Sequence, residues 1–295
     1  MFGECHAHIV MDGVNYKTAM ARHEHGVDET VIHAHFEEYR KRHITFVRDG
    51  GDAYDVSHRA KAIAPAYGID YRSPIFAIHK NGHYGGIVGR GFDTMAEYAK
   101  LVDAAACEGA DFIKIMTTGI MDFDLYGTIM VGTPLEASEV REMVHIAHEQ
   151  GFAVMSHTNG TGPVNDAIEA GVSSIEHGNF IDEETICALA QSRTAYVPTA
   201  TVARNLIGCG DFDDAEVTRI WEKSADNIRL AYAHGAIIAL GSDAGAVGVP
   251  HGEGLLDEYS CFKDAIVGTG TADAAALDAR LAAGEAFIRD TFKRG

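Results

Sequence analysis

Two histidines near the start of the chain, His6 and His8, have the type and spacing of a metal-binding pair. They stand two positions apart in the segment GECHAHIVMDG, residues 3–13. Alternate side chains of a β-strand leave the same face, so both imidazoles would point to one side. Imidazole nitrogen binds borderline metals such as zinc. Ordinary hydrogen bonds would satisfy such a pair equally well, so this segment leaves both interpretations open.

Further candidate ligands stand at the ends of other strand-like runs. His157 ends FAVMSH, His177 ends SSIEH, and Asp243 follows AIIALGS. Each has an ordinary alternative, because a histidine can bond a backbone carbonyl and an aspartate commonly caps a helix. Cys5 alternates away from the neighbouring histidines, so we expect it to pack rather than to bind metal. Together, the imidazoles and the carboxylate form a donor set that suits a borderline metal.

Lys114 lies in the middle of the apolar run DFIKIM, residues 111–116. A buried lysine is costly unless it is paired, neutral or modified. Burial favours loss of its proton, and the free amine could then form a Schiff base or react with carbon dioxide. The carbamate from the second reaction is anionic and could bridge two cations. Schiff-base chemistry is the alternative, but it leaves the histidines unexplained.

The elements that must position these residues alternate along the chain. Eight strand-like runs are each followed by a helical candidate, and Thr94 with Glu97 forms a capping-box pattern at the start of one helix, 93–108. The eight runs are 2–9, 44–48, 74–78, 112–116, 152–156, 173–176, 195–198 and 236–240.

Eight such units predict an α/β protein with a closed (β/α)₈ barrel, the TIM-barrel fold. We expect a single domain over residues 1–295, with the barrel at about 3–267 and a helical tail at 272–291. An open doubly wound sheet is the alternative, but no Gly-x-Gly-x-x-Gly follows the first run. In a barrel, the candidate ligands at the carboxyl ends of the strands would converge.

Composition limits the function classes. Hydrophobic residues make up 46% of the 295 residues, enough to bury a sizeable core. The formal net charge of -19 disfavours nucleic acid and anionic membranes as partners. Five cysteines without a CxxC pair favour free thiols in a reducing cytoplasm, and we find neither a leader nor a membrane-spanning run. We expect a cytoplasmic protein that acts on a small molecule, and a homo-oligomer is left open.

The segments CHAH, ADFIKIMTTG, VMSHT, SIEHG and GSDAG, in this order and spacing, resemble the amidohydrolase superfamily. Within it they are similar to the subgroup with two metals and a carboxylated lysine. ADFIKIM, SIEHG and HGEGLLDEY most resemble the prolidase-like members, which cleave Xaa-amino-acid bonds. The likeness spans residues 3 to about 267. Most relatives carry a β-sandwich domain beside the barrel, which we expect to be absent here because only five residues precede His6 and the tail reads as helix.

The resemblance implies a role for each candidate. His6, His8 and Asp243 would hold the more buried metal, His157 and His177 the more exposed one, and carboxylated Lys114 would bridge both. The cofactors would be two divalent metal ions, with zinc as the expected metal. Asp243 would be the catalytic general base beside a metal-bridging hydroxide.

The implied reaction is hydrolysis of an amide C–N bond in a small molecule, such as a dipeptide or an N-acyl amino acid. Hydrolysis of an ester, lactone or phosphoester by the same binuclear site is the alternative. A third interpretation is a non-catalytic metal-binding barrel or a Schiff-base lyase that uses Lys114.

Substrate contacts are expected from the loops that follow the strands. The glycine-rich segment HKNGHYGG, residues 79–86, offers His83 and Tyr84 as hydrogen-bonding groups. Arg204 would suit a substrate carboxylate through two parallel hydrogen bonds, and His251 lies in another strand-end loop. A further group of histidines has a spacing that fits either a second metal site or a solvated helix face: His23, His25, His33 and His35.

Overall fold

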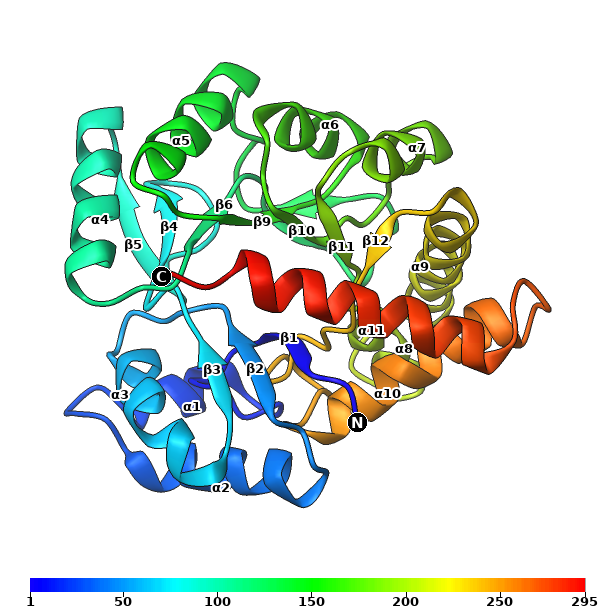
Figure 1. Ribbon diagram of the computed structural model, residues 1–295, viewed down its shortest axis with the longest axis horizontal. Coiled ribbons are helices and arrows are strands. Elements are labelled where there is room, and N and C mark those ends of the chain that lie inside the picture. Colours follow the sequence, from blue (N-terminus) through cyan, green and yellow to red (C-terminus); the bar gives the residue numbers. More distant parts are fainter. Residues whose placement is uncertain (295) are drawn as a thin grey trace.

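The computed structural model describes residues 1–294, which form a parallel β/α barrel with helices around it (Figure 1). The barrel strands, in chain order, are β1 (Glu4–Ala7), β2 (Phe46–Asp49), β3 (Asp70–Arg72), β4 (Ala77–Lys80), β6 (Ile113–Met116), β9 (Val154–Thr158), β10 (Ser174–His177), β11 (Ala195–Val197) and β12 (Ile237–Ile238). Hydrogen-bonded neighbours run in the orders β1-β2-β3 and β12-β11-β10-β9-β6-β4. Each of the eight predicted runs overlaps one of these strands.

Two junctions close these strands into a barrel with eight strand positions. The third position is divided, because β3 pairs with β2 whereas β4 pairs with β6. Between β3 and β4, the carbonyl of Ile75 accepts from the amide of Asp52 at 3.0 Å. At the other junction, the amide of Cys5 donates to the carbonyl of Leu240 at 2.9 Å, which joins β1 to the segment after β12. The predicted TIM barrel is confirmed.

Three further strands lie outside the barrel wall and were not predicted. β5 (Gly89–Phe92) pairs with β4. β7 (Ile120–Met121) and β8 (Ile129–Met130) form an antiparallel hairpin after β6. Every strand of residues 1–294 belongs to the barrel, to β5 or to this hairpin, so no β-sandwich accompanies the barrel in this part of the chain.

The helices follow the strands and cover the outside of the barrel. They are α1 (Tyr16–Ala21), α2 (Glu29–Lys41), α3 (Val56–Ile63), α4 (Met95–Cys107), α5 (Ala137–Glu149), α6 (Thr161–Ala170), α7 (Glu183–Gln191), α8 (Thr201–Leu206), α9 (Asp214–His234), α10 (Glu253–Phe262) and α11 (Ala274–Thr291). The predicted capping box is present at the start of α4, where Thr94 and Glu97 bond each other's backbone amides. Within the described residues, none of these helices has the length and apolar character needed to cross a lipid bilayer.

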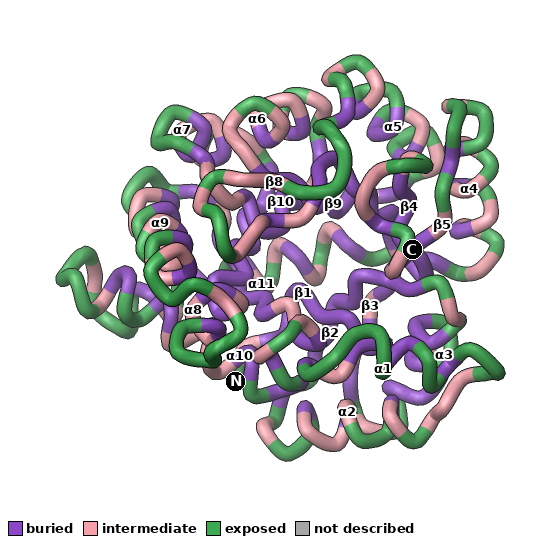
Figure 2. Tube along the Cα trace, turned by 180° about the vertical axis from the view of Figure 1, so that it is seen from behind, coloured by how far each residue is buried: buried purple, intermediate pink, exposed green. Residues whose placement is uncertain are grey.

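α11 closes one end of the barrel and crosses it in the view of Figure 1. Ile288 and the following Phe292 pack against Phe46, at the start of β2, and Phe112, just before β6. These are the amino ends of the strands. The carboxyl ends therefore open on the opposite side of the barrel. This side faces the reader in Figure 2, which is turned by 180° from Figure 1. The predicted tail, residues 272–291, corresponds to α11, which packs directly on the barrel. The division into a barrel at about 3–267 and a separate tail stays a prediction.

We predict that Gly284→Ala destabilises the protein, because α11 approaches β12 closely at this position. A Cβ added to Gly284 would lie 1.8 Å from the carbonyl oxygen of Ile238. Overpacking of this kind costs about 1–3 kcal/mol, which urea unfolding would measure. Gly162→Ala is the matched control, because Gly162 lies in α6 and its added Cβ meets nothing within 4 Å. Equal stability of the two variants would show that α11 does not need this close approach.

Candidate metal centre

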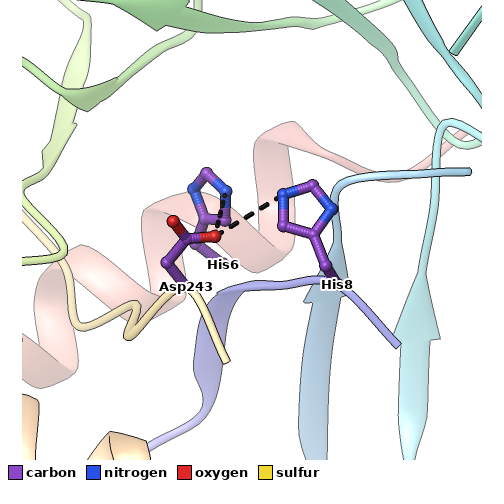
Figure 3. Close-up of side chains that lie close together, drawn as sticks. All are labelled: His6, His8 and Asp243. Carbon is purple, nitrogen blue, oxygen red and sulfur yellow. Dashed lines mark ion pairs between the residues drawn. The ribbon is translucent and has the colours of Figure 1, made fainter. Parts of the chain in front are cut away.

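Three side chains at the carboxyl ends of β1 and β12 bring their donor atoms together (Figure 3). Nε2 of His6 and Nε2 of His8 each lie 3.5 Å from Oδ1 of Asp243, and the donor atoms all lie within 4.8 Å of one another. Tetrahedral zinc with bonds of about 2.0–2.1 Å places its ligand atoms about 3.3–3.4 Å apart. The spacing and the chemistry of these groups therefore fit the ligand set of one metal ion.

Lys114 reaches the same cluster from β6. Its Nζ lies 3.3 Å from Nε2 of His6 and 3.4 Å from Nε2 of His8. The side chain is 1% exposed, and this burial lowers the pKa of the amine. A neutral amine among imidazoles is the form that can react with carbon dioxide or with a carbonyl.

His157 and His177, at the ends of β9 and β10, complete the group. Their ring centroids lie 4.6 Å apart, and the ring of His177 lies 5.0 Å from that of His6. Nε2 of His157 bonds the carbonyl of Gly119 at 2.9 Å, and Nδ1 of His177 bonds Oγ1 of Thr199 at 2.7 Å. These contacts orient the rings and leave Nδ1 of His157 and Nε2 of His177 as the nitrogens for a metal. The structure thus brings all six predicted ligands to one end of the barrel: His6, His8, Lys114, His157, His177 and Asp243.

Burial decides the charge of these groups. It lowers the pKa of His157 to about 4 and moves the pKa of His6, His8 and His177 well below the usual value for histidine. Burial also raises the pKa of Asp243 to about 6. The imidazoles are therefore neutral near pH 7 and have lone pairs with which to bind a cation.

Glu176 on β10 was not predicted, although it orients His6. Its Oε2 accepts a hydrogen bond from Nδ1 of His6 at 2.7 Å, which leaves Nε2 of that ring facing the cluster. Nη2 of Arg48 lies 2.9 Å from both oxygens of Glu176, and all three side chains are fully buried. A signal was present in the sequence, because Arg48 and Glu176 are charged residues within runs that otherwise predict buried strands.

Two other buried carboxylates hold the loops that carry the cluster. Glu4 accepts hydrogen bonds from the amide and the hydroxyl of Ser242, the residue before Asp243, at 2.8 and 2.6 Å. Asp49 accepts from the amide of Ile9, the residue after His8, at 2.9 Å. The backbone at both strand ends is therefore fixed by side chains from inside the barrel.

The backbone is strained at three residues of the site. Thr199, His177 and Asp243 have φ angles of 51°, 68° and 61°, in the left-handed region that favours glycine. Such conformations persist only where surrounding contacts enforce them, and they concentrate at functional sites. This strain is a further indication that the cluster is functional.

A cavity of about 550 Å³ opens onto the cluster, and Lys114, His157 and Asp243 are among its lining residues. His83 and Tyr84, two of the predicted substrate contacts, also line it. The ring of Tyr84 lies 5.1 Å from the ring of His157. These two residues are therefore placed where a substrate would contact them.

Arg204 and His251, the other two predicted substrate contacts, are not among the lining residues. Arg204 lies on α8, a helix that was not predicted, and its Nη2 pairs with Asp264 at 2.7 Å. The ring nitrogens of His251 bond the hydroxyl of Tyr39 at 3.0 Å and the carbonyl of Met11 at 2.9 Å. Both side chains are engaged in holding loops, so the structure does not place them as substrate contacts.

The remaining histidines of the first loop and α2 bond to separate partners. His23 accepts from the amide of Asp28 at 3.1 Å, and His33 bonds the hydroxyl of Tyr67 at 2.8 Å. The ring of His35 stacks on that of His251 with centroids 3.9 Å apart. Within residues 1–294, the only group of three or more His, Cys, Asp or Glu side chains spaced to hold a metal ion is His6, His8 and Asp243, so His23, His25, His33 and His35 form no second site of this kind.

We predict that Glu176→Gln lowers the free energy of unfolding by about 3 kcal/mol, because it leaves the buried Arg48 without its counter-charge. Denaturant unfolding of the metal-free protein would measure the loss. Glu108→Gln is the matched control, since Glu108 pairs with Arg90 at 2.6 Å where both side chains are about one-third exposed. A surface pair of this kind contributes about 1 kcal/mol or less. Similar losses in the two variants would contradict the structural importance of the buried pair.

The sequence of this chain is similar to those of known proteins. A sequence model described as "Amidohydrolase family" matches residues 5–279. An uncharacterized protein of Mycobacterium tuberculosis is 27% identical over 137 residues, which cover 44% of this chain and 36% of that protein. Ochratoxinase of Aspergillus niger is 29% identical over 159 residues, 51% of this chain and 32% of that enzyme. The matches thus span about a third of the length of these curated relatives.

Solved structures show the same architecture. The crystal structure of a Xaa-Pro dipeptidase with bound methionine in the active site superposes with a TM-score of 0.76 at 22% identity. The superposition covers 98% of this chain and 75% of that chain. The likeness shows that the two proteins share a fold.

Proposed function

This chain belongs to the amidohydrolase family, and from that premise we propose that it is a binuclear metal-dependent hydrolase that cleaves an amide C–N bond of a small molecule. The observation that carries the proposal is the position of Lys114, whose Nζ lies 3.3 and 3.4 Å from Nε2 of His6 and of His8 inside the barrel. The names of two similar proteins, an ochratoxinase and a Xaa-Pro dipeptidase, support a hydrolase.

The residues divide between two metal ions. His6, His8 and Asp243 would hold one ion, and His157 with His177 would hold the other. The neutral amine of Lys114 would add to carbon dioxide and release a proton, and the resulting carbamate would bridge the two ions. Nitrogen and oxygen donors of this kind make zinc the expected metal.

The chain's own groups would carry the proton transfers and position the substrate. When bound, the metal ions supply Lewis acidity, which lowers the pKa of a water molecule and polarises the substrate carbonyl. Asp243 would accept the proton of that water and pass it to the leaving amine. Tyr84, which lines the cavity, can donate its hydroxyl hydrogen to the substrate carbonyl.

A small molecule is the partner that these features favour. The formal net charge of -19 opposes binding of nucleic acid or an anionic membrane. All five cysteines are free thiols, which supports a location in the reducing cytoplasm.

We predict that Lys114→Ala folds but loses most of its bound metal. Without the metal ions the transition state would lose several kcal/mol of stabilisation, which would reduce kcat/KM by about 100-fold or more. Short carboxylic acids that replace the carbamate should partly restore activity. Elemental analysis and turnover would measure both effects. Lys80→Ala is the control, because Lys80 also ends a barrel strand but pairs with Glu139 at 2.7 Å. Full metal content and activity in Lys114→Ala would rule out the bridging role.

A substrate panel tests the reaction class. We expect the zinc-loaded enzyme to hydrolyse amides with a higher kcat/KM than lactones or phosphotriesters, to lose activity with a chelator and to regain it with zinc. Preference for a lactone or phosphotriester would favour the alternative hydrolase on the same site. Irreversible labelling of Lys114 by borohydride in the presence of substrate, with activity resistant to chelation, would instead support a Schiff-base lyase.

A further inference from the structure

Apart from the proposed metal ions, which would engage the water and the scissile carbonyl, the cavity offers no free side-chain cation to a substrate. Among the residues of 1–294 that line it, Lys114 is the only lysine or arginine, and its Nζ faces His6 and His8. His83, the lining imidazole outside the proposed ligands, donates its Nδ1 hydrogen to the carbonyl of Thr133 at 3.0 Å. Burying a carboxylate without a partner is costly. A substrate carboxylate that lies in this cavity away from the metal ions would therefore lose its hydration without gaining an ion pair.

The remaining polar groups of the cavity are neutral. Tyr84, Asn179 and Ser224 line it and present a hydroxyl, an amide and a hydroxyl. Such groups bond a carbonyl oxygen or an amide N–H without needing a charge on the ligand. Their chemistry matches an amide group whose substituents are uncharged.

The walls of the cavity are mostly apolar. Met116, Met121 and Leu206 are among the wall residues. Except for Met1, every large apolar side chain that is exposed within residues 1–294 lies in a segment that follows a barrel strand: Val14 and Tyr16 after β1, Leu125, Met130 and Val131 after β6, Ile207 after β11 and Val247 after β12. Of these, Tyr16, Val131 and Val247 also line the cavity, where they extend its apolar lining. Figure 2 views the end of the barrel from which these segments project.

We propose that the substrate is an amide with uncharged, apolar groups on both sides of the C–N bond, such as an N-acyl arylamine or the amide of an N-acyl amino acid. The inference rests on the proposed function and excludes as preferred substrates the dipeptides and N-acyl amino acids with free carboxylates. Hydrolysis breaks the C–N bond, adds the hydroxyl of water to the acyl carbon and gives the remaining proton to the amine. The negative charge of the whole chain acts in the same direction, because it repels anions from the entrance.

Matched substrates test this proposal. The zinc-loaded enzyme would be assayed with N-octanoyl-phenylalanine and with its primary amide, N-octanoyl-phenylalaninamide. We expect kcat/KM for cleavage of the octanoyl amide bond to be higher by about tenfold or more for the neutral member, since an unpaired buried charge costs at least that factor. Equal or better turnover of the acid would overturn the proposal. Absence of hydrolysis of both compounds and of every other amide in the panel would reject the proposed function, and the binding measurement below would then judge the cavity's preference by itself.

Trp221 provides a binding signal that does not depend on turnover. It is the single tryptophan of the chain and packs against the cluster of Met121, Ala203 and Ile220, of which Met121 and Ala203 line the cavity. Quenching of its fluorescence in metal-free protein would report the affinities of decanamide and decanoate. We expect decanamide to bind more tightly by about tenfold. Equal or tighter binding of decanoate would overturn the inference even if amide hydrolysis is observed.

A charge introduced into the wall should change the preference. Val202 lies on α8, lines the cavity and is half-buried. Val202→Arg should favour decanoate over decanamide relative to the unmodified protein, whereas Val202→Met, similar in length but uncharged, should keep the preference for decanamide. Circular dichroism would confirm that both variants fold. The same shift in both variants would show that the shape of the wall sets the preference, which would overturn the proposal.

Discussion

The buried ion pair between Arg48 and Glu176 supports both the candidate metal centre and the end of the barrel that α11 closes. Glu176 accepts the Nδ1 hydrogen of His6, so the direction of that imidazole follows from the position of the carboxylate. Arg48 also donates from Nε to the carbonyl of Cys5 at 2.6 Å, and its guanidinium lies 4.3 Å from the ring of Phe292. One side chain therefore connects β1, β10 and the end of α11. Because the pair is fully buried, the loss of either partner would leave an uncompensated charge in the core.

Exclusion of water explains the chemistry of the cluster as well as its geometry. Burial favours the neutral forms of His6, His8 and Lys114, and repulsion by the neighbouring basic groups lowers the pKa of the two histidines further. A cation that enters this cluster meets free lone pairs rather than protons. The carboxylates of Glu4 and Asp49 hold the adjacent loops through backbone amides, so ordering of the ligands does not have to wait for a metal.

The fold and the six candidate ligands could be predicted because both depend on local pattern. Alternation of apolar runs with helical segments indicates a β/α barrel, and a lysine such as Lys114 within an apolar strand stands out without any structural knowledge. The division of the third strand is not evident from local pattern; Ile75, between β3 and β4, has a φ of 67°, which is unusual for a β-branched residue.

Arg204 lies outside the cavity lining because its direction is set by α8 and by Asp264, which is distant in sequence. His251 is absent from the lining for a similar reason, since Tyr39 and His35 engage it from α2. Loops at strand ends take their shape from such distant contacts, and a single sequence does not specify them. The role of Glu176 in orienting His6 could not be predicted, because it depends on a contact between β1 and β10 that is distant in sequence.

The segment that carries β7 and β8 leaves and rejoins the barrel at a narrow neck, where the amide of Leu135 donates to the carbonyl of Thr117 at 2.9 Å. Met121 and Val131 of this segment line the cavity, whereas its contact with the proposed ligands at the neck is the Gly119 carbonyl that receives His157. Residues 120–134 therefore form a segment that is suited to exchange between homologous barrels by protein engineering. A graft that keeps Gly119 would exchange part of the pocket lining and leave the imidazoles where they are.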